Sequence, residues 1–220
     1  MDLQRLSRNE AAFIIGVPIA WGLLLLLHPG GEATDVYGAL EDSVARGLIV
    51  HVGMLIFIPL MAVAIFLLLR GVAGRAAQLA RVALVPFVIF YSAWETLQGI
   101  ANAVLVDEVN GLSGSDRDLG ANLVQDFAES PLVRDLGVLA LIGTLAFIIA
   151  TVAAGIALRR HAGATQPVAI LIGVSGFLIT AHPPPFGPAG LALFALAVYL
   201  YVRGRTPVEA PAASSKPGIA

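Results

Sequence analysis

Apolar residues in this chain come in six blocks separated by short polar stretches. Four blocks reach the length of a membrane-spanning helix, about 17–25 residues: 11–27, 47–69, 82–106 and 136–158. Two shorter blocks, 167–181 and 187–202, flank the proline-rich sequence HPPPFGP, which cannot continue a helix. We interpret them as a tight helical hairpin, and the alternative is that one of them is re-entrant. The pattern predicts an all-α integral membrane protein, a bundle of six transmembrane helices.

The composition agrees with this interpretation. Hydrophobic residues make up 58% of the 220 residues and charged residues 13%, whereas a soluble domain carries about 25% charged residues. The lipid bilayer is therefore the expected partner. No basic patch with interleaved aromatics indicates nucleic-acid binding. Cysteine is absent, which excludes disulfides, thiolate metal ligands and a cysteine nucleophile.

A single domain accounts for nearly the whole chain. We expect residues 1–206 to form one transmembrane helical domain and residues 207–220, rich in Pro, Ala and Ser, to be a disordered tail. The first apolar block follows Arg5 and Arg8 as in a signal peptide, but no small-residue cleavage site comes after it. It is interpreted as an uncleaved span. The loop 107–135 contains a possible short amphipathic helix over 121–129.

The basic residues predict the orientation. Ten of the 13 lysines and arginines lie in the N-terminus, the 70–81 loop, the 159–166 loop and the C-terminal tail. Arg46, Arg117 and Arg134 lie in the other loops, which are rich in Asp and Glu. Cytoplasmic loops carry the excess of Lys and Arg. We therefore expect a multi-pass protein of the plasma membrane with both termini in the cytoplasm.

Polar side chains form a stripe on the third predicted span. At about 100° per residue, Tyr91, Glu95, Gln98 and Asn102 fall within a sector of about 60°, and Trp94 lies at its edge. Lipid would penalise this stripe, so it is predicted to face the bundle interior. These five residues are the candidate ligand-binding set.

Glu95 is the unusual member of the stripe. It precedes Val106 by 11 residues, about 16 Å of helix, which is near the middle of a hydrocarbon core about 30 Å thick. No Lys or Arg lies within any predicted span, so we expect a protonated carboxyl satisfied by Tyr91 and Gln98. It either ties helices together or acts as a proton donor, proton carrier or ligand contact.

Three of the four histidines are predicted at the outer face. His28 ends the first span, His51 lies in the first turns of the second, and His182 ends the fifth. Imidazoles on separate helices can bind a metal ion such as zinc, copper or iron, and two of them can hold a haem. The alternative is that they are ordinary interfacial residues, since His28 and His182 each precede a proline and mark helix ends. No compact histidine motif is present.

Three functions are compatible with these features. The first is an outward-facing polar cavity that binds or translocates a small ligand or a proton, with Glu95 as its protonatable contact. The second is a non-catalytic subunit or assembly factor, in which the stripe faces a membrane-protein partner or another copy of the chain. The third is an enzyme that acts on a lipid-like substrate, using a metal, a haem or an acid.

The HPGG sequence after the first span, followed by a histidine early in the second, resembles membrane proteins of high-GC bacteria. The resemblance covers about the first third of the chain and implies no activity. Membrane hydrolases with a three-histidine zinc site usually carry an accompanying aspartate within a span. No predicted span contains an aspartate here.

Overall fold

Each of the six apolar blocks forms a helix. The computed structural model describes residues 6–30 and 35–204, and within these ranges the chain has no strands. The predicted tail, 207–220, lies outside the described residues. The helices that match the six blocks are α1 (Arg8–Leu25), α3 (Val44–Leu68), the run from α4 to α6 (Arg75–Asn110), α8 (Val138–His161), α9 (Gln166–Thr180) and α10 (Phe186–Arg203).

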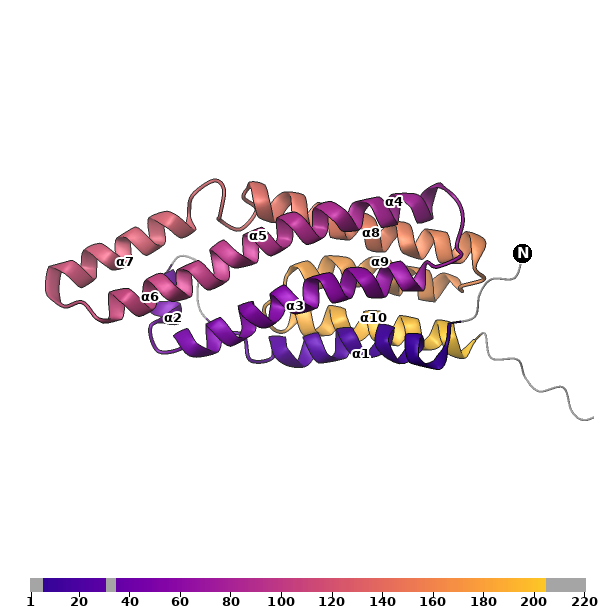
Figure 1. The fold of residues 1–220 in the computed structure, drawn as a ribbon, viewed down its shortest axis with the longest axis horizontal. Coiled ribbons are helices and arrows are strands. Elements are labelled where there is room, and N and C mark those ends of the chain that lie inside the picture. Colours follow the sequence, from indigo (N-terminus) through magenta and orange to yellow (C-terminus); the bar gives the residue numbers. More distant parts are fainter. Residues whose placement is uncertain (1–5, 31–34, 205–220) are drawn as a thin grey trace, which may run out of the picture.

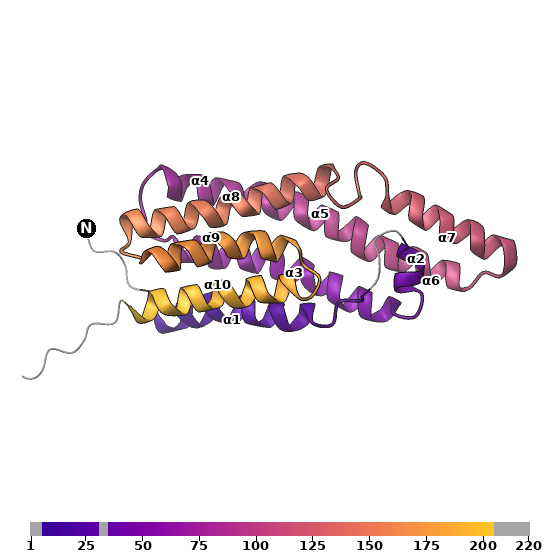
Figure 2. The same ribbon diagram turned by 180° about the vertical axis from the view of Figure 1, so that it is seen from behind.

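These helices pack side by side as one elongated bundle (Figures 1 and 2). Neighbours along the chain are mostly neighbours in space: α1 packs on α3 and α10, α10 on α9, α9 on α8, and α8 on α4. Contacts between α3 and the middle of the α4–α6 run close the ring. On α8, Ala146, Ala150 and Ala154 are buried at four-residue spacing, and these small side chains let neighbouring helices approach closely.

The bundle is apolar on its outside as well as inside. Large hydrophobic side chains such as Leu23, Ile56, Leu145 and Phe177 are between 49% and 62% exposed, as expected for helices that contact lipid. Among the described residues, five helices are long and apolar enough to cross a membrane, and α9 is shorter at 15 residues. The structure is thus a membrane-compatible helical bundle with five clear candidate spans.

The third helix differs from the prediction. It runs without interruption from Arg75 to Asn110, 36 residues or about 54 Å at 1.5 Å per residue, instead of covering 82–106. Two segments within it are π-helical, η1 (Phe87–Tyr91) and η2 (Glu95–Ala101), and a single α-helical turn, α5 (Ser92–Trp94), joins them. The helix extends beyond the predicted span at both ends. It includes residues 75–81, which were predicted as loop, and the acidic residues after Val106. Residues 75–81 consist of Ala, Arg, Gln and Leu, which are good helix formers.

The last part of this helix, α6 (Asn102–Asn110), projects past the bundle and meets two further helices (Figure 1). These are α2 (Val36–Leu40) and α7 (Gly114–Ala128). The amphipathic helix predicted over 121–129 is therefore longer and begins earlier. Tyr37 holds the three helices together: its hydroxyl donates to Asn110 Oδ1 at 2.7 Å and accepts from Arg117 Nε at 2.6 Å.

The two ends of the bundle differ in charge. The start of α1, the turn between α3 and α4, the turn between α8 and α9 and the end of α10 lie together at one end (Figures 1 and 2). We call it the basic end, because these segments carry Arg8, Arg70, Arg75, Arg159, Arg160 and Arg203. The opposite end, formed with α2, α6 and α7, carries most of the Asp and Glu residues, and we call it the acidic end.

Candidate metal centre

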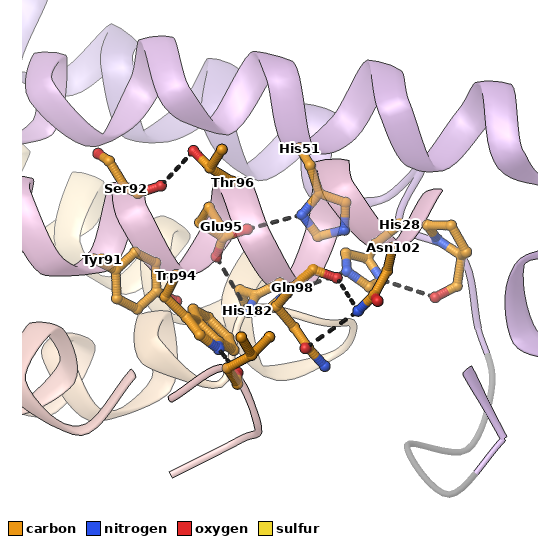
Figure 3. A network of polar contacts seen from close by, with 12 residues as sticks. His28, His51, Tyr91, Ser92, Trp94, Glu95, Thr96, Gln98, Asn102 and His182 are labelled. Carbon is orange, nitrogen blue, oxygen red and sulfur yellow. Dashed lines mark hydrogen bonds and ion pairs between the residues drawn. The ribbon is translucent and has the colours of Figure 1, made fainter. Parts of the chain in front are cut away.

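Three histidines meet where α1 and α9 terminate, on the side of the bundle that faces the acidic end. His28 follows the last turn of α1, His182 follows the C-cap of α9, and His51 lies within α3. Their rings stand edge to face, with centroids 4.9 to 6.0 Å apart. One nitrogen from each ring lies within 4.8 Å of the others. Residues 154 positions apart thus converge on one point (Figure 3).

The hydrogen bonds of two rings fix which nitrogen is free. His28 Nδ1 lies 2.7 Å from the carbonyl oxygen of Pro29. Because a carbonyl only accepts, Nδ1 carries the proton, and Nε2 of the neutral ring keeps its lone pair. His51 Nδ1 lies 2.8 Å from Glu95 Oε2, which leaves His51 Nε2 free to bind a ligand.

The third ring completes the arrangement. His182 Nε2 lies 3.1 Å from His28 Nε2. Two ligand nitrogens around a tetrahedral metal ion, each about 2.0–2.1 Å from it, would be about 3.3 Å apart. The two nitrogens therefore have nearly the spacing that a shared metal ion requires.

Glu95 is the partner of two of these histidines. Its side chain is 1% exposed, and while Oε2 pairs with His51, Oε1 lies 3.9 Å from His182 Nδ1. Oε1 has no hydrogen-bond partner among the described residues, which is costly for a buried acceptor. A small rotation of His182 toward Oε1 would satisfy this oxygen. All three rings would then present Nε2 to the common centre, with each Nδ1 directed at an oxygen.

The surroundings keep two of the histidines neutral. Burial, and then repulsion from His182 and His51, lowers the pKa of His28 to about 4. Burial, followed by repulsion from His51, lowers the pKa of His182 to about 3. Neutral imidazole is the form that binds metal, so near neutral pH these rings need lose no proton to do so.

Close packing determines the position of His51. A Cβ atom at Gly99 would lie 2.1 Å from Cγ and Nδ1 of the His51 ring, well inside the van der Waals contact distance. Only glycine at this position of η2 lets the imidazole pass the helix backbone and reach Glu95.

A cavity of about 160 Å³ adjoins the three rings. Trp94, Gln98 and Asp135 line it together with the three histidines, and α2 closes one side with Val36, Ala39 and Leu40. Partial burial, followed by the charge of Glu95, raises the pKa of Asp135 above its ordinary value. Asp135 lies in the loop before α8 and is exposed at the cavity mouth.

The five residues of the predicted stripe on the third span do not all line one cavity. Tyr91, Trp94, Glu95 and Asn102 are buried, and Gln98 is partly buried. Trp94 and Gln98 line the cavity; Tyr91 and Asn102 do not. The Tyr91 hydroxyl donates to the Thr180 carbonyl at 3.4 Å, and the Asn102 amide donates to Gln98.

The expectation that Tyr91 and Gln98 satisfy Glu95 is wrong, because His51 does so. The third helix continues to Asn110, so Val106 does not mark its end, and Glu95 lies beside His182, which follows the C-cap of α9. The depth of Glu95 in a membrane stays a prediction. Asp135 and Gly99 were not predicted as part of a site. Asp135 was one loop acid among many, and a glycine within a span gives no signal of a contact in space.

Comparisons with protein-family models, with curated proteins and with solved structures gave no match. The function is therefore argued from the site itself.

Proposed function

We propose that this protein is a membrane metalloprotein that binds one divalent transition-metal ion, zinc in the first place, through His28, His51 and His182. The observation that carries the proposal is the convergence of three imidazole nitrogens, one from within α3 and two from just after the ends of α1 and α9, two of them 3.1 Å apart. Glu95 supports it, since a ligating histidine usually donates its other N–H to a carboxylate or carbonyl. In this chain Glu95 and the Pro29 carbonyl supply those acceptors.

A metal ion fits this geometry better than a haem does. The axial ligands of a haem lie on opposite faces of a flat macrocycle, and two nitrogens 3.1 Å apart leave no room for one between them. Zinc is favoured because catalytic zinc sites commonly have three protein ligands, three histidines among them, and keep a fourth position open. Here the cavity of about 160 Å³ lies beside the three rings.

The activity that we propose for the site is hydrolysis. The ion would supply a Lewis acid that polarises a carbonyl or phosphoryl oxygen and makes water a nucleophile near neutral pH. Water then adds to the carbonyl or phosphoryl centre, the bond to the leaving alcohol or amine breaks, and the proton lost by the water is returned to that leaving group. Glu95 holds His51 and orients His182, while Asp135 at the cavity mouth is placed to carry the proton.

Translocation through the bundle has less support. On the basic-end side of Glu95 the interior is filled by fully buried apolar side chains, among them Trp21, Ile58, Met61 and Phe147. Within the described residues these side chains form one continuous hydrophobic cluster. A pocket that binds from one end fits this packing; a path across the membrane does not.

The membrane arrangement belongs to the same proposal. We infer six spans, with α9 as the short fifth, in the plasma membrane, and with the basic end and both termini in the cytoplasm. The supporting observation is the gathering of arginines at one end of the bundle. The histidine cluster then lies at the outer membrane–water interface.

The test is metal analysis of the full-length protein purified in mild detergent. We expect about one zinc ion per chain, and its loss in His28→Ala, His51→Ala and His182→Ala. His161→Ala is the matched control, because this fourth histidine lies at the other end of the bundle and should leave the metal content unchanged. A metal-free preparation that also fails to take up zinc, cobalt, copper or iron would overturn the proposed site.

Hydrolysis needs a separate measurement. Zinc-loaded and chelator-treated protein are compared on a panel of carboxylic esters, amides and phosphate esters. We expect turnover that requires the metal and disappears in His51→Ala. A protein that holds stoichiometric zinc but hydrolyses no member of the panel would refute the hydrolase and leave the metal site.

A further inference from the structure

A second cavity adjoins the histidine cluster at His182. It has a volume of about 390 Å³ and lies between the start of α8 and the end of α9. Trp94, Asp135, His182 and Pro183 line both this cavity and the smaller one. The two cavities therefore share a wall at His182, one of the three candidate ligands.

The second cavity is lined by both polar and apolar residues, and the exposed ones include Asp135 and the apolar Leu136. Its floor includes Ala140 and Thr144, which are four residues apart and so lie on one face of α8. Leu136, at its edge, is 75% exposed, and Val138 and Leu141 beside it are 51% and 43% exposed. Side chains of this kind are stable in contact with lipid. In the six-span arrangement inferred above, this side of the bundle contacts lipid, whereas the smaller cavity lies against α2.

The position of the second cavity along the bundle matches that of the polar linkage of a membrane lipid. The cavity lies where α9 ends, at Thr180 and Ala181, and where α8 begins. For helices that span a bilayer, this level is the boundary between hydrocarbon and headgroups. The polar linkage of a membrane lipid lies at the same depth, with its chain extending toward the middle of the bilayer.

We propose that a single-chain membrane amphiphile enters the site sideways, between α8 and α9. Its polar linkage lies at Asp135 and His182, and its chain lies along Leu136, Ala140 and Thr144. The inference rests on the proposed metal site and names its substrate class. A volume of about 390 Å³ is at the lower end of the range for ligand pockets, about 300–1,000 Å³, which suits one chain and its linkage better than a two-chain lipid.

Trp94 provides a direct probe, because it lines both cavities. The chain has two tryptophans. The other, Trp21, is fully buried and stacks on Phe57. Its indole N–H has no partner among the described residues, so Trp21→Phe removes an unsatisfied donor and keeps the ring stacking. In this background, in phosphatidylcholine nanodiscs, the added probe is lysophosphatidylcholine with a brominated chain, which quenches tryptophan by contact.

We expect saturable quenching of Trp94. Thr144→Phe fills the floor of the cavity and should weaken the apparent affinity by about tenfold, the effect of excluding about two methylenes. Leu145→Phe is the matched control: it is the next residue on α8, is 49% exposed and does not line the cavity. Quenching that rises linearly with the probe, or equally in Thr144→Phe and Leu145→Phe, would mean ordinary lipid contact and would overturn the proposal.

Zinc content measured in the same samples separates this inference from the metal site. Saturable quenching that is sensitive to Thr144→Phe in a protein without metal would refute the proposed function and keep the entrance. Stoichiometric zinc with linear quenching would refute the entrance and keep the metal site.

Discussion

The two carboxylate oxygens of Glu95 have different surroundings, and this makes the residue a sensitive test of the site. Oε2 accepts from His51, while Oε1 lacks a hydrogen bond and lies nearest to His182. Glu95→Gln keeps the shape but replaces the carboxyl group that accepts from His51 with an amide, which would support the proposed metal ligand less well. Loss of such a partner typically weakens metal binding by about 10–100-fold. We expect a decrease of this size in a competition titration with a chelator.

Glu108→Gln is the matched control, because it makes the same chemical change on the same long helix at an exposed position in α6. Its metal affinity should equal that of the unchanged protein. Equal affinities for the Glu95 and Glu108 variants would show that Glu95 has no role in holding the ion.

Gly99 tests whether close packing positions His51. In Gly99→Ala the new methyl group would overlap the His51 ring, since its Cβ would lie 2.1 Å from two ring atoms. We expect the ring to be displaced from Glu95, with weaker zinc binding and a loss of about 1–3 kcal/mol in unfolding free energy. Denaturation in detergent measures the second effect.

The control for this substitution is Gly16→Ala in α1, where a Cβ meets no atom within 4 Å. It should leave stability unchanged or raise it by about 0.5–1 kcal/mol. If Gly99→Ala behaved in the same way, close packing at this position would not hold the His51 ring in place.

The amino-acid sequence anticipated the members of this cluster but not their relation. Helix ends and topology placed His28, His51 and His182 at one face. Helical spacing singled out Glu95, but as a separate feature. The bond between His51 and Glu95 joins residues 44 positions apart on two helices. Their meeting depends on how α3 turns against the third helix, and no periodicity within either helix contains that information.

The third helix shows where pattern reasoning about an element fails. The predicted stripe assumes a regular α-helix with about 100° per residue. The π-helical segments η1 and η2 contain wider turns, which change the direction of each side chain that follows. Glu95 and Gly99 both lie in η2, so the π-helical segment supplies two of the residues that this helix contributes to the site. Single-turn departures of this kind are frequent at functional sites.

The short helix α2 depends on its neighbours, and this gives a prediction about the cavity wall. The Tyr37 hydroxyl links α2 to Asn110 on α6 and Arg117 on α7. Tyr37→Phe removes both bonds, a loss of about 1–2 kcal/mol. We expect the amides of Val36–Leu40 to exchange with deuterium about tenfold faster. Tyr199→Phe, at a tyrosine 47% exposed on α10, should leave this exchange unchanged. Unaltered protection in Tyr37→Phe would mean that other contacts hold α2.

Arginines gather at one end of the bundle and acidic residues at the other, and the sequence was sufficient to predict these two ends. Successive helices run in opposite directions, so successive loops lie at opposite ends of the bundle. The arginine-rich loops therefore gather at one end. The packing order of the helices was not predictable in this way, because most of the long helices are apolar over most of their surface. Closure of the ring by contacts between α3 and the third helix is a property of the three-dimensional fold.

Which end faces the cytoplasm is open to a direct test, because the chain has no cysteine of its own. Ser115→Cys places a thiol at an exposed position in α7 at the acidic end, and Thr165→Cys places one at an exposed position between α8 and α9 at the basic end. With the excess of arginine inside, a membrane-impermeant maleimide should label Ser115→Cys in intact cells. Thr165→Cys should react only after the membrane is permeabilised. The reverse pattern would place the histidine cluster on the cytoplasmic side, and an amphiphile would then have to enter from the inner leaflet.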